Sequence, residues 1–156
     1  MSVGCRAVKR TLAILMVAAT ALLSACGEDK AETYKKDFKP VNQEILDLGE
    51  SVGKAVQGAS GKSDAALAKE FGDLAERTGK LQQEVDELEP PDDLTAPQED
   101  LTQAMGDAQD ALEGIEKAAG ENDANSARES AEQLVKASED LRDSRRKIAK
   151  ETGAKQ

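Results

Sequence analysis

Residues 67–88, LAKEFGDLAERTGKLQQEVDEL, carry the pattern that decides the fold of this chain. Along this stretch, apolar side chains and one threonine recur in steps of four and three residues, at Leu67, Phe71, Leu74, Thr78, Leu81, Val85 and Leu88. Such steps place side chains on one face of an α-helix, whereas side chains on one face of a strand recur every second residue. The stretch therefore predicts an amphipathic helix over residues 64–89 with one buried face.

Three further stretches of the chain show the same spacing. The first contains Tyr34, Phe38, Val41, Ile45, Leu48, Val52 and Ala55, the second Leu101, Met105, Ala108, Leu112, Ile115 and Ala119, and the third Ala127, Ala131, Leu134, Ser138, Leu141, Arg145 and Ile148. These stripes predict helices over residues 32–58, 96–119 and 123–151. No stretch shows the sustained alternation that a strand requires.

The segments between the stripes are rich in residues that end helices. Residues 58–63 (GASGKS), 90–93 (PPDD) and 120–123 (GEND) supply glycine, proline and capping side chains, and Thr95 and Gln98 have the spacing of a capping box. Short connections between helices of similar length favour antiparallel neighbours. We therefore expect an all-α domain over residues 32–156, an up-down-up-down four-helix bundle. A long coiled-coil homodimer and a three-helix packing with one stray helix are the alternatives.

Proline and glycine inside the predicted helices weaken them. Pro40 lies within the first stripe, so that helix either kinks there or begins near Lys39. Glycines, each of which costs about 1 kcal/mol relative to alanine in a helix interior, stand at Gly49, Gly53, Gly72, Gly79, Gly106 and Gly114. We favour close approach of neighbouring helices as the explanation. The alternatives are helices that move, or a partner that completes the core.

The charged residues are segregated along the chain. No Lys or Arg lies between Leu81 and Glu116, whereas basic residues gather after residue 136. The loop before the third predicted helix and that helix's first turn present an acidic patch of Asp92, Asp93, Glu99 and Asp100. In an antiparallel bundle we expect this patch to lie near Arg142, Arg145, Arg146 and Lys147, and to be available to a partner. It lacks the spacing of a calcium-binding loop.

The composition excludes several kinds of chemistry. The 156 residues contain no His, which rules out His-based triads, His-ligated haem and His-containing zinc sites. Residues 61–63 read Gly-Lys-Ser, but Val56 stands where a phosphate-binding loop needs its first glycine. A net charge of −10 disfavours binding to nucleic acid. We therefore predict that the chain is not an enzyme and holds no metal or cofactor other than covalent lipid.

Residues 1–26 differ from the rest of the chain. Arg6, Lys9 and Arg10 precede an apolar run, LAILMVAATALL, at residues 12–23, and no acidic residue occurs before Glu28. A basic head, a short apolar run and small residues at its exit are typical of a secretory signal. The run is shorter than the ~20 residues that a membrane-spanning helix needs. A buried N-terminal helix is the alternative interpretation.

The end of this segment resembles the lipobox of bacterial lipoproteins. Leu23, Ser24 and Ala25 supply an aliphatic residue and two small residues directly before Cys26. The resemblance implies a signal peptide over residues 1–25 and a diacylglyceryl group on the Cys26 sulfur, with N-acylation as a further modification. It also implies a short tether over residues 26–31 and anchoring in the lipid bilayer at the extracytoplasmic face of the cell membrane. The alternative is an ordinary secretory signal in which the cysteine occurs by chance.

Cleavage at this position would change the charge and the cysteine content. It would remove three positive charges and no negative ones, which moves the net charge from −10 to −13. Cys5 would be lost with the signal, so the lipidated Cys26 would be the one remaining cysteine. No disulfide would then stabilise the domain.

These expectations describe a lipid-anchored helical protein without catalytic groups. We expect it to act as a binding or scaffold module for a protein or a cell-wall polymer near the bilayer. The alternative is a carrier of a small apolar ligand within the bundle, which a cavity would favour; an exposed apolar helix face would favour the scaffold. The mature part is similar in composition to small helical lipoproteins of high-GC Gram-positive bacteria, including a Pro-Pro-acid-acid-Leu loop at residues 90–94. That resemblance implies no particular activity.

Overall fold

A computed structural model of the protein describes residues 25–156, with side chains from residue 30 onward. These residues form four long helices, α1 (Ala25–Gly58), α2 (Asp64–Asp86), α3 (Thr95–Glu121) and α4 (Ala124–Thr152), and a short 3-10 turn, η1 (Ala59–Gly61). No strand occurs in this part of the chain. The all-α class and the four predicted helices are therefore confirmed. Leu23 and Ser24 of the lipobox, with the rest of residues 1–24, lie outside the described residues.

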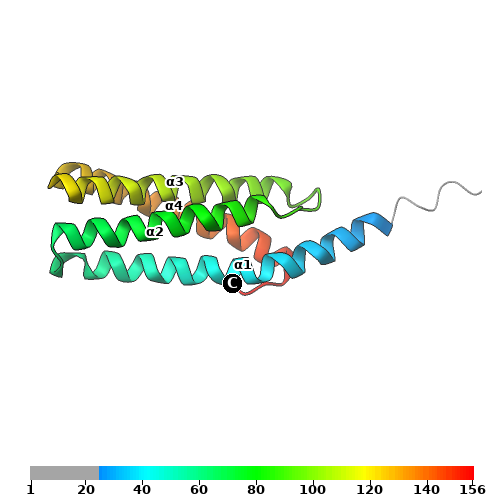
Figure 1. Ribbon diagram of the computed structural model, residues 1–156. Coiled ribbons are helices and arrows are strands. Elements are labelled where there is room, and N and C mark those ends of the chain that lie inside the picture. Colours follow the sequence, from blue (N-terminus) through cyan, green and yellow to red (C-terminus); the bar gives the residue numbers. More distant parts are fainter. Residues whose placement is uncertain (1–24) are drawn as a thin grey trace, which may run out of the picture.

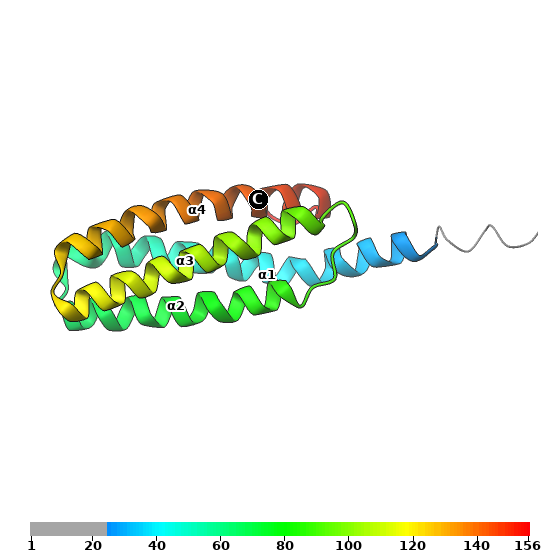
Figure 2. The same ribbon diagram turned by 90° about the horizontal axis from the view of Figure 1, so that it is seen from above.

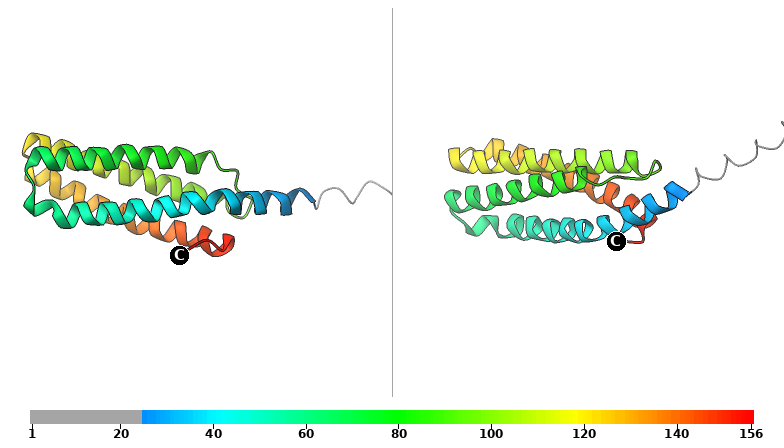
Figure 3. Two further views of the ribbon diagram at one scale, coloured as in Figure 1. Left: turned by 60° about the horizontal axis from the view of Figure 1, so that its bottom comes forward. Right: turned by 45° about the vertical axis from the view of Figure 1, so that its right-hand side comes forward.

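The first helix starts earlier than its stripe predicts. It begins at Ala25, so the stretch 26–31, which we expected to be a tether, is helical. It also continues through Pro40, whose ring lacks an N–H and crowds the preceding turn. Figure 3 (right) shows the first turns of α1, in blue, at an angle to the rest of the helix. The helix therefore kinks and does not begin at the proline.

Capping side chains fix two of the helix starts. Ser63 Oγ accepts a hydrogen bond from the Ala66 N–H at 3.4 Å at the start of α2. Asp123 Oδ1 accepts from the N–H groups of Asn125 and Ser126 at 3.0 and 3.2 Å at the start of α4. These bonds satisfy amides that have no partner within the helix.

The capping box predicted at the start of α3 is wrong. Leu94 occupies the N-cap position, and no side chain caps this helix. The Gln98 amide instead donates from Nε2 to the carbonyl oxygens of Val85 and Leu88, both at 3.0 Å. The Val85 carbonyl also accepts from the Leu88 N–H at 3.2 Å, so the amide adds a second donor there and reaches the Leu88 carbonyl just beyond α2. The buried amide ties α3 to α2 across the proline-containing connection.

The four helices lie side by side, and their connections alternate between two ends. The α1–α2 and α3–α4 connections lie at one end, and the α2–α3 connection and the end of α4 lie at the other (Figures 1 and 2). The closest backbone packing is between α3 and its neighbours α2 and α4, while α1 packs less closely against α2 and α4. The helix that carries the predicted lipid anchor is therefore the one held least tightly.

One face of each helix contributes to a single core. The largest fully buried hydrophobic side chains are Tyr34, Phe38, Leu101, Met105, Leu112, Ile148 and Val85. All core residues lie between Tyr34 and Ile148, and Ala154 packs against them from the C-terminal tail. Residues 27–156 therefore contain the whole of the described core.

The glycines within the helices fall into two groups. A methyl group added at Gly114 would lie 2.4 Å from Ser130 Oγ on α4, and one added at Gly72 would lie 2.8 Å from the Glu116 carboxylate on α3. Gly79 and Gly106 likewise face side chains across the α2–α3 interface. These positions fit the close helix approach that we favoured. Gly49 and Gly53 on α1 have no atom within 4 Å of the added carbon, so close packing does not explain them.

The two groups of glycines predict that a Gly→Ala substitution changes stability in opposite directions. Gly49→Ala is expected to raise the free energy of unfolding by about 0.5–1 kcal/mol, because alanine is the better helix former and the space is open. Gly114→Ala is expected to lower it by about 1–3 kcal/mol, because the methyl group would push α3 away from α4. Urea denaturation of residues 27–156, followed by circular dichroism, measures both. Changes of equal sign and size would contradict the packing assigned to α3 and α4.

Candidate functional site: a groove between α1 and α4

The predicted acidic patch is exposed, and only part of its expected pairing forms. Asp92, Asp93, Glu99 and Asp100 are all exposed to solvent. Lys147 Nζ lies 3.4 Å from Asp100 Oδ2, so the first turns of α3 and the end of α4 do meet.

The arginines of α4 do not join this contact. Arg142 Nε lies 3.6 Å from Asp143 Oδ1 on its own helix, and Arg145 is buried against α1. The expected pairing of the arginines with the patch is therefore wrong. Successive residues of a helix point about 100° apart, and the side chains next to Lys147 in sequence turn to other faces.

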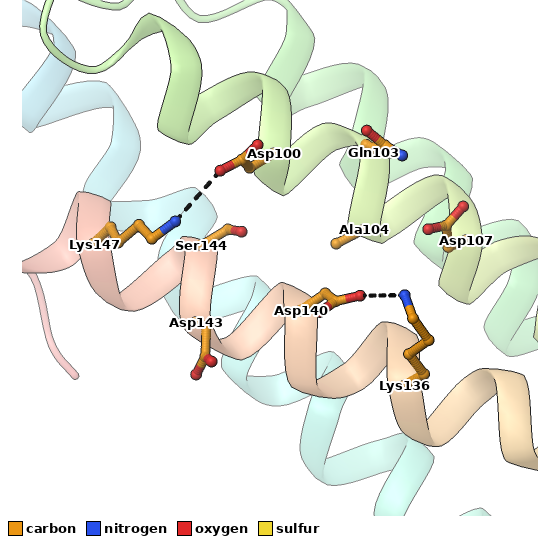
Figure 4. A pocket seen from close by; sticks show the side chains of 9 residues that line it. All are labelled: Asp100, Gln103, Ala104, Asp107, Lys136, Asp140, Asp143, Ser144 and Lys147. Atoms are coloured by element: carbon orange, nitrogen blue, oxygen red, sulfur yellow. Dashed lines mark hydrogen bonds and ion pairs between the residues drawn. The ribbon is translucent and has the colours of Figure 1, made fainter.

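The surface next to this contact carries several carboxylates. Asp100 and Asp107 from α3 and Asp140 and Asp143 from α4 line an open hollow of about 410 Å³ (Figure 4). Lys147 pairs with Asp100, and Lys136 Nζ lies 2.8 Å from Asp140 Oδ2. No group of three metal-ligating side chains is close enough to hold a metal ion within residues 25–156. This hollow is a solvated face on which two lysines balance two of the four carboxylates.

A second hollow lies between α1 and α4 and is mainly apolar. Its volume is about 320 Å³. The apolar part of its wall includes Ile45, Leu46, Leu48, Val52, Ala108, Leu112, Leu134 and Leu141. An outer hollow of about 450 Å³ shares Gly49, Val52, Leu134, Ser138 and Arg142 with it and extends to Val56 and Val135. We call the two hollows together the α1–α4 groove.

The sequence creates this groove by placing small residues where α1 faces α4. Gly49 and Gly53 have no side chain to fill the space, and Ala131 and Ser138 on α4 are small. Ala131 and Ser138 belong to the predicted fourth stripe, yet they are exposed in the groove. α4 buries Ala137 and Ser144 in their place. The fourth stripe is therefore only partly correct, because α4 packs closely on α3 and loosely on α1.

A buried guanidinium group lies at one end of the groove. Arg145 is only 4% exposed, and it makes no ion pair with any carboxylate of the described residues. Its Nη1 donates hydrogen bonds to Asn42 Oδ1 at 3.0 Å and to the Lys155 carbonyl at 3.1 Å. Asn42 Nδ2 donates to the same carbonyl at 2.9 Å. This network joins α1, α4 and the C-terminal tail.

No carboxylate among the described residues balances the charge of Arg145. Burial lowers the pKa of Arg145, and the nearby charge of Arg146 lowers it further. A guanidinium group nevertheless remains protonated at neutral pH. Desolvating a charge without a counter-charge is costly, so the buried position requires compensation from neutral hydrogen-bond acceptors or from an anion. Within the described residues, neutral acceptors alone provide it.

Two more arginines lie beside Arg145 at the same end of the groove. Arg142 and Arg146 both line the inner hollow. Arg142 has the 3.6 Å contact with Asp143, and both of these side chains are more than half exposed. Arg146 makes no ion pair or hydrogen bond with any residue of the described part of the chain. Three arginines thus line one end of an apolar groove, and Asp143, which contacts Arg142, lines the other hollow and not the groove.

The groove was not predicted from the sequence, although some of the residues that form it stood out in the pattern. Arg145 stands at a stripe position where the pattern calls for a buried residue, and Arg142 and Arg146 are its near neighbours. We interpreted all three as surface partners of the acidic patch. Gly49 and Gly53, which interrupt the first predicted helix, were the second indication. Nothing in the spacing indicated that α1 would face these arginines.

Neither a protein-family model nor a curated protein nor a solved structure matches this chain. Within the described residues, no helix combines the length and the apolar character needed to cross a bilayer.

Proposed function

We propose that this chain is a lipoprotein held by Cys26 at the extracytoplasmic face of the cell membrane, and that its up-down-up-down helical domain is a non-enzymatic binding module. In this proposal the α1–α4 groove binds a small, largely apolar molecule. The anchor rests on the lipobox resemblance, and the helix order rests on the alternating connections. The single observation that supports the ligand is the apolar inner hollow of about 320 Å³, which lies within the size range of small-molecule sites.

The carrier was our alternative from the sequence, and the groove now favours it over the scaffold. A scaffold needs a broad exposed apolar face, and the described residues expose only Val56 (52%) and Val135 (61%) among their large hydrophobic side chains. Both valines lie at the outer end of the groove. They are the observation that favours a protein partner as the second candidate, because a partner helix could cover this end.

A neutral probe tests the ligand-binding proposal. Titration of residues 27–156 with decan-1-ol is expected to give saturable binding of one molecule per chain. Gly49→Leu is expected to weaken it at least tenfold, because the new side chain enters the groove where the space is open. Gly120→Leu is the matched control, since Gly120 is a helical glycine with equally open surroundings outside the groove. Binding that Gly49→Leu leaves unchanged would contradict the proposal.

A further inference from the structure

We propose that the α1–α4 groove selects a single-chain amphiphile with a carboxylate head, of the fatty-acid class, and that Arg142, Arg145 and Arg146 bind the head. This inference rests on the proposed function and adds the chemical class of the ligand. In the bound arrangement the carboxylate lies at the arginine end. The alkyl chain extends along Leu141, Leu134 and Val52 toward Gly53.

The arginine end provides the anion site through the charge of Arg145, which pairs with no carboxylate in the part of the chain that the structure describes. Arg145 is buried, lines the inner hollow and receives no carboxylate from the described residues. Its Nη1 is used by Asn42 and Lys155, which leaves the other two guanidinium nitrogens without a hydrogen-bond acceptor among the described residues. An anion within reach would supply both the acceptor and the counter-charge.

Arg142 and Arg146 extend this site to the surface. Arg146 has no partner among residues 25–156, and Arg142 has only its 3.6 Å contact with Asp143. Guanidinium groups present planar pairs of donors that match the two oxygens of a carboxylate. The chain carries a net charge of −10, so its overall electrostatic field repels anions. The arginine cluster is a local positive exception to that field.

The size and lining of the groove determine the apolar part of the ligand. Beyond the arginines, aliphatic side chains form most of the inner wall, with Gly49, Thr78 and Ser138 as the exceptions, so the body of the ligand is expected to be apolar. A volume of about 320 Å³ lies at the lower end of the range for ligand sites, which fits one alkyl chain better than two. Glu139 lines the outer hollow, where it disfavours a carboxylate and thereby orients the head toward the arginines.

Three probes with the same alkyl chain test the assignment on residues 27–156. Decanoate is expected to bind about tenfold or more tightly than decan-1-ol, because charge-assisted hydrogen bonds exceed neutral ones. Decyltrimethylammonium is expected to bind more weakly than the alcohol, since its head carries the charge of the arginines. Raising the salt concentration should weaken decanoate binding and leave decanol binding unchanged.

A pair of variants separates the site from the overall charge. Arg146→Gln is expected to weaken decanoate binding about tenfold and to change decanol binding less than twofold. Lys147→Gln removes the same charge one residue away, where the side chain pairs with Asp100 outside the groove, and is expected to leave both affinities unchanged. Both side chains belong to exposed residues, so neither change disturbs the core.

The outcomes distinguish this inference from the proposed function. If decanoate and decanol bind equally well and Gly49→Leu weakens both, the groove binds apolar ligands and the carboxylate assignment is wrong. If Arg146→Gln and Lys147→Gln have the same effect, the arginines are not the head site. If neither probe binds at one site per chain, both proposals are wrong.

Discussion

Leu81→Ala is expected to lower the free energy of unfolding of residues 27–156 by about 2–5 kcal/mol. Leu81 is 3% exposed and belongs to the core that joins all four helices. Truncation removes buried methyl groups and leaves a cavity that rigid neighbouring helices do not close. Because small domains have total stabilities of only ~5–15 kcal/mol, this single change is expected to remove a large share of the stability. Urea denaturation followed by far-ultraviolet circular dichroism measures the effect.

Val135→Ala is the control for this experiment. Val135 is 61% exposed at the outer end of the groove, so its truncation is expected to change the stability by less than about 0.5 kcal/mol. Equal losses from Leu81→Ala and Val135→Ala would show that the stripe of α2 does not face the core. A circular dichroism spectrum with substantial strand content would contradict the helical fold itself.

Cys26→Ala is expected to abolish incorporation of radiolabelled fatty acid and to leave uncleaved precursor in cells. The thiol is the group that receives the lipid in the chemistry that the lipobox resemblance implies, and alanine supplies no sulfur to form the thioether. Cys5→Ala is the matched control, because Cys5 precedes the apolar run and would leave with the signal. It is expected to retain full labelling and normal processing. Labelled and normally processed Cys26→Ala protein would rule out the lipoprotein assignment.

The two outcomes bear on different parts of the chain. Leu81→Ala tests the packing of the described helices, whereas Cys26→Ala tests processing that depends on the N-terminal segment. A folded domain that is not lipidated would keep its groove and lose its proposed place at the membrane. The binding experiments on residues 27–156 therefore remain informative whatever the labelling shows.

The loose packing of α1 connects the fold to the proposed function. α3 approaches α2 and α4 closely because glycine and alanine occupy those interfaces, as at Gly114 and Ala137. α1 presents larger side chains to the core, such as Phe38 and Ile45, and two of its glycines, Gly49 and Gly53, line the groove. A ligand between α1 and α4 would add contacts to the weakest interface. We therefore expect ligand binding to raise the melting temperature of the domain.

The sequence by itself determined the helices, because the steps of three and four residues depend only on local geometry. The stripe of residues 67–88 predicted α2 to within three residues at its end, and the glycine- and proline-rich segments separated the four helices where the chain does turn. Local patterns were less reliable where one side chain had a choice between two hydrogen-bond partners. The buried Gln98 amide bonds to the Val85 and Leu88 carbonyls at the end of α2 and not to its own helix start.

Only the tertiary structure decided which faces meet, and this is what created the candidate site. The pattern placed Arg145 on a buried face of α4, but whether that face meets the acidic patch, α3 or α1 depends on the rotation of α4 about its axis. In the folded bundle Ser130 packs on Gly114 of α3, and Arg145 on the same helix reaches Asn42, 103 residues away in the chain. Helical periodicity specifies a face of each helix, whereas the fit of side chains between helices selects its neighbour.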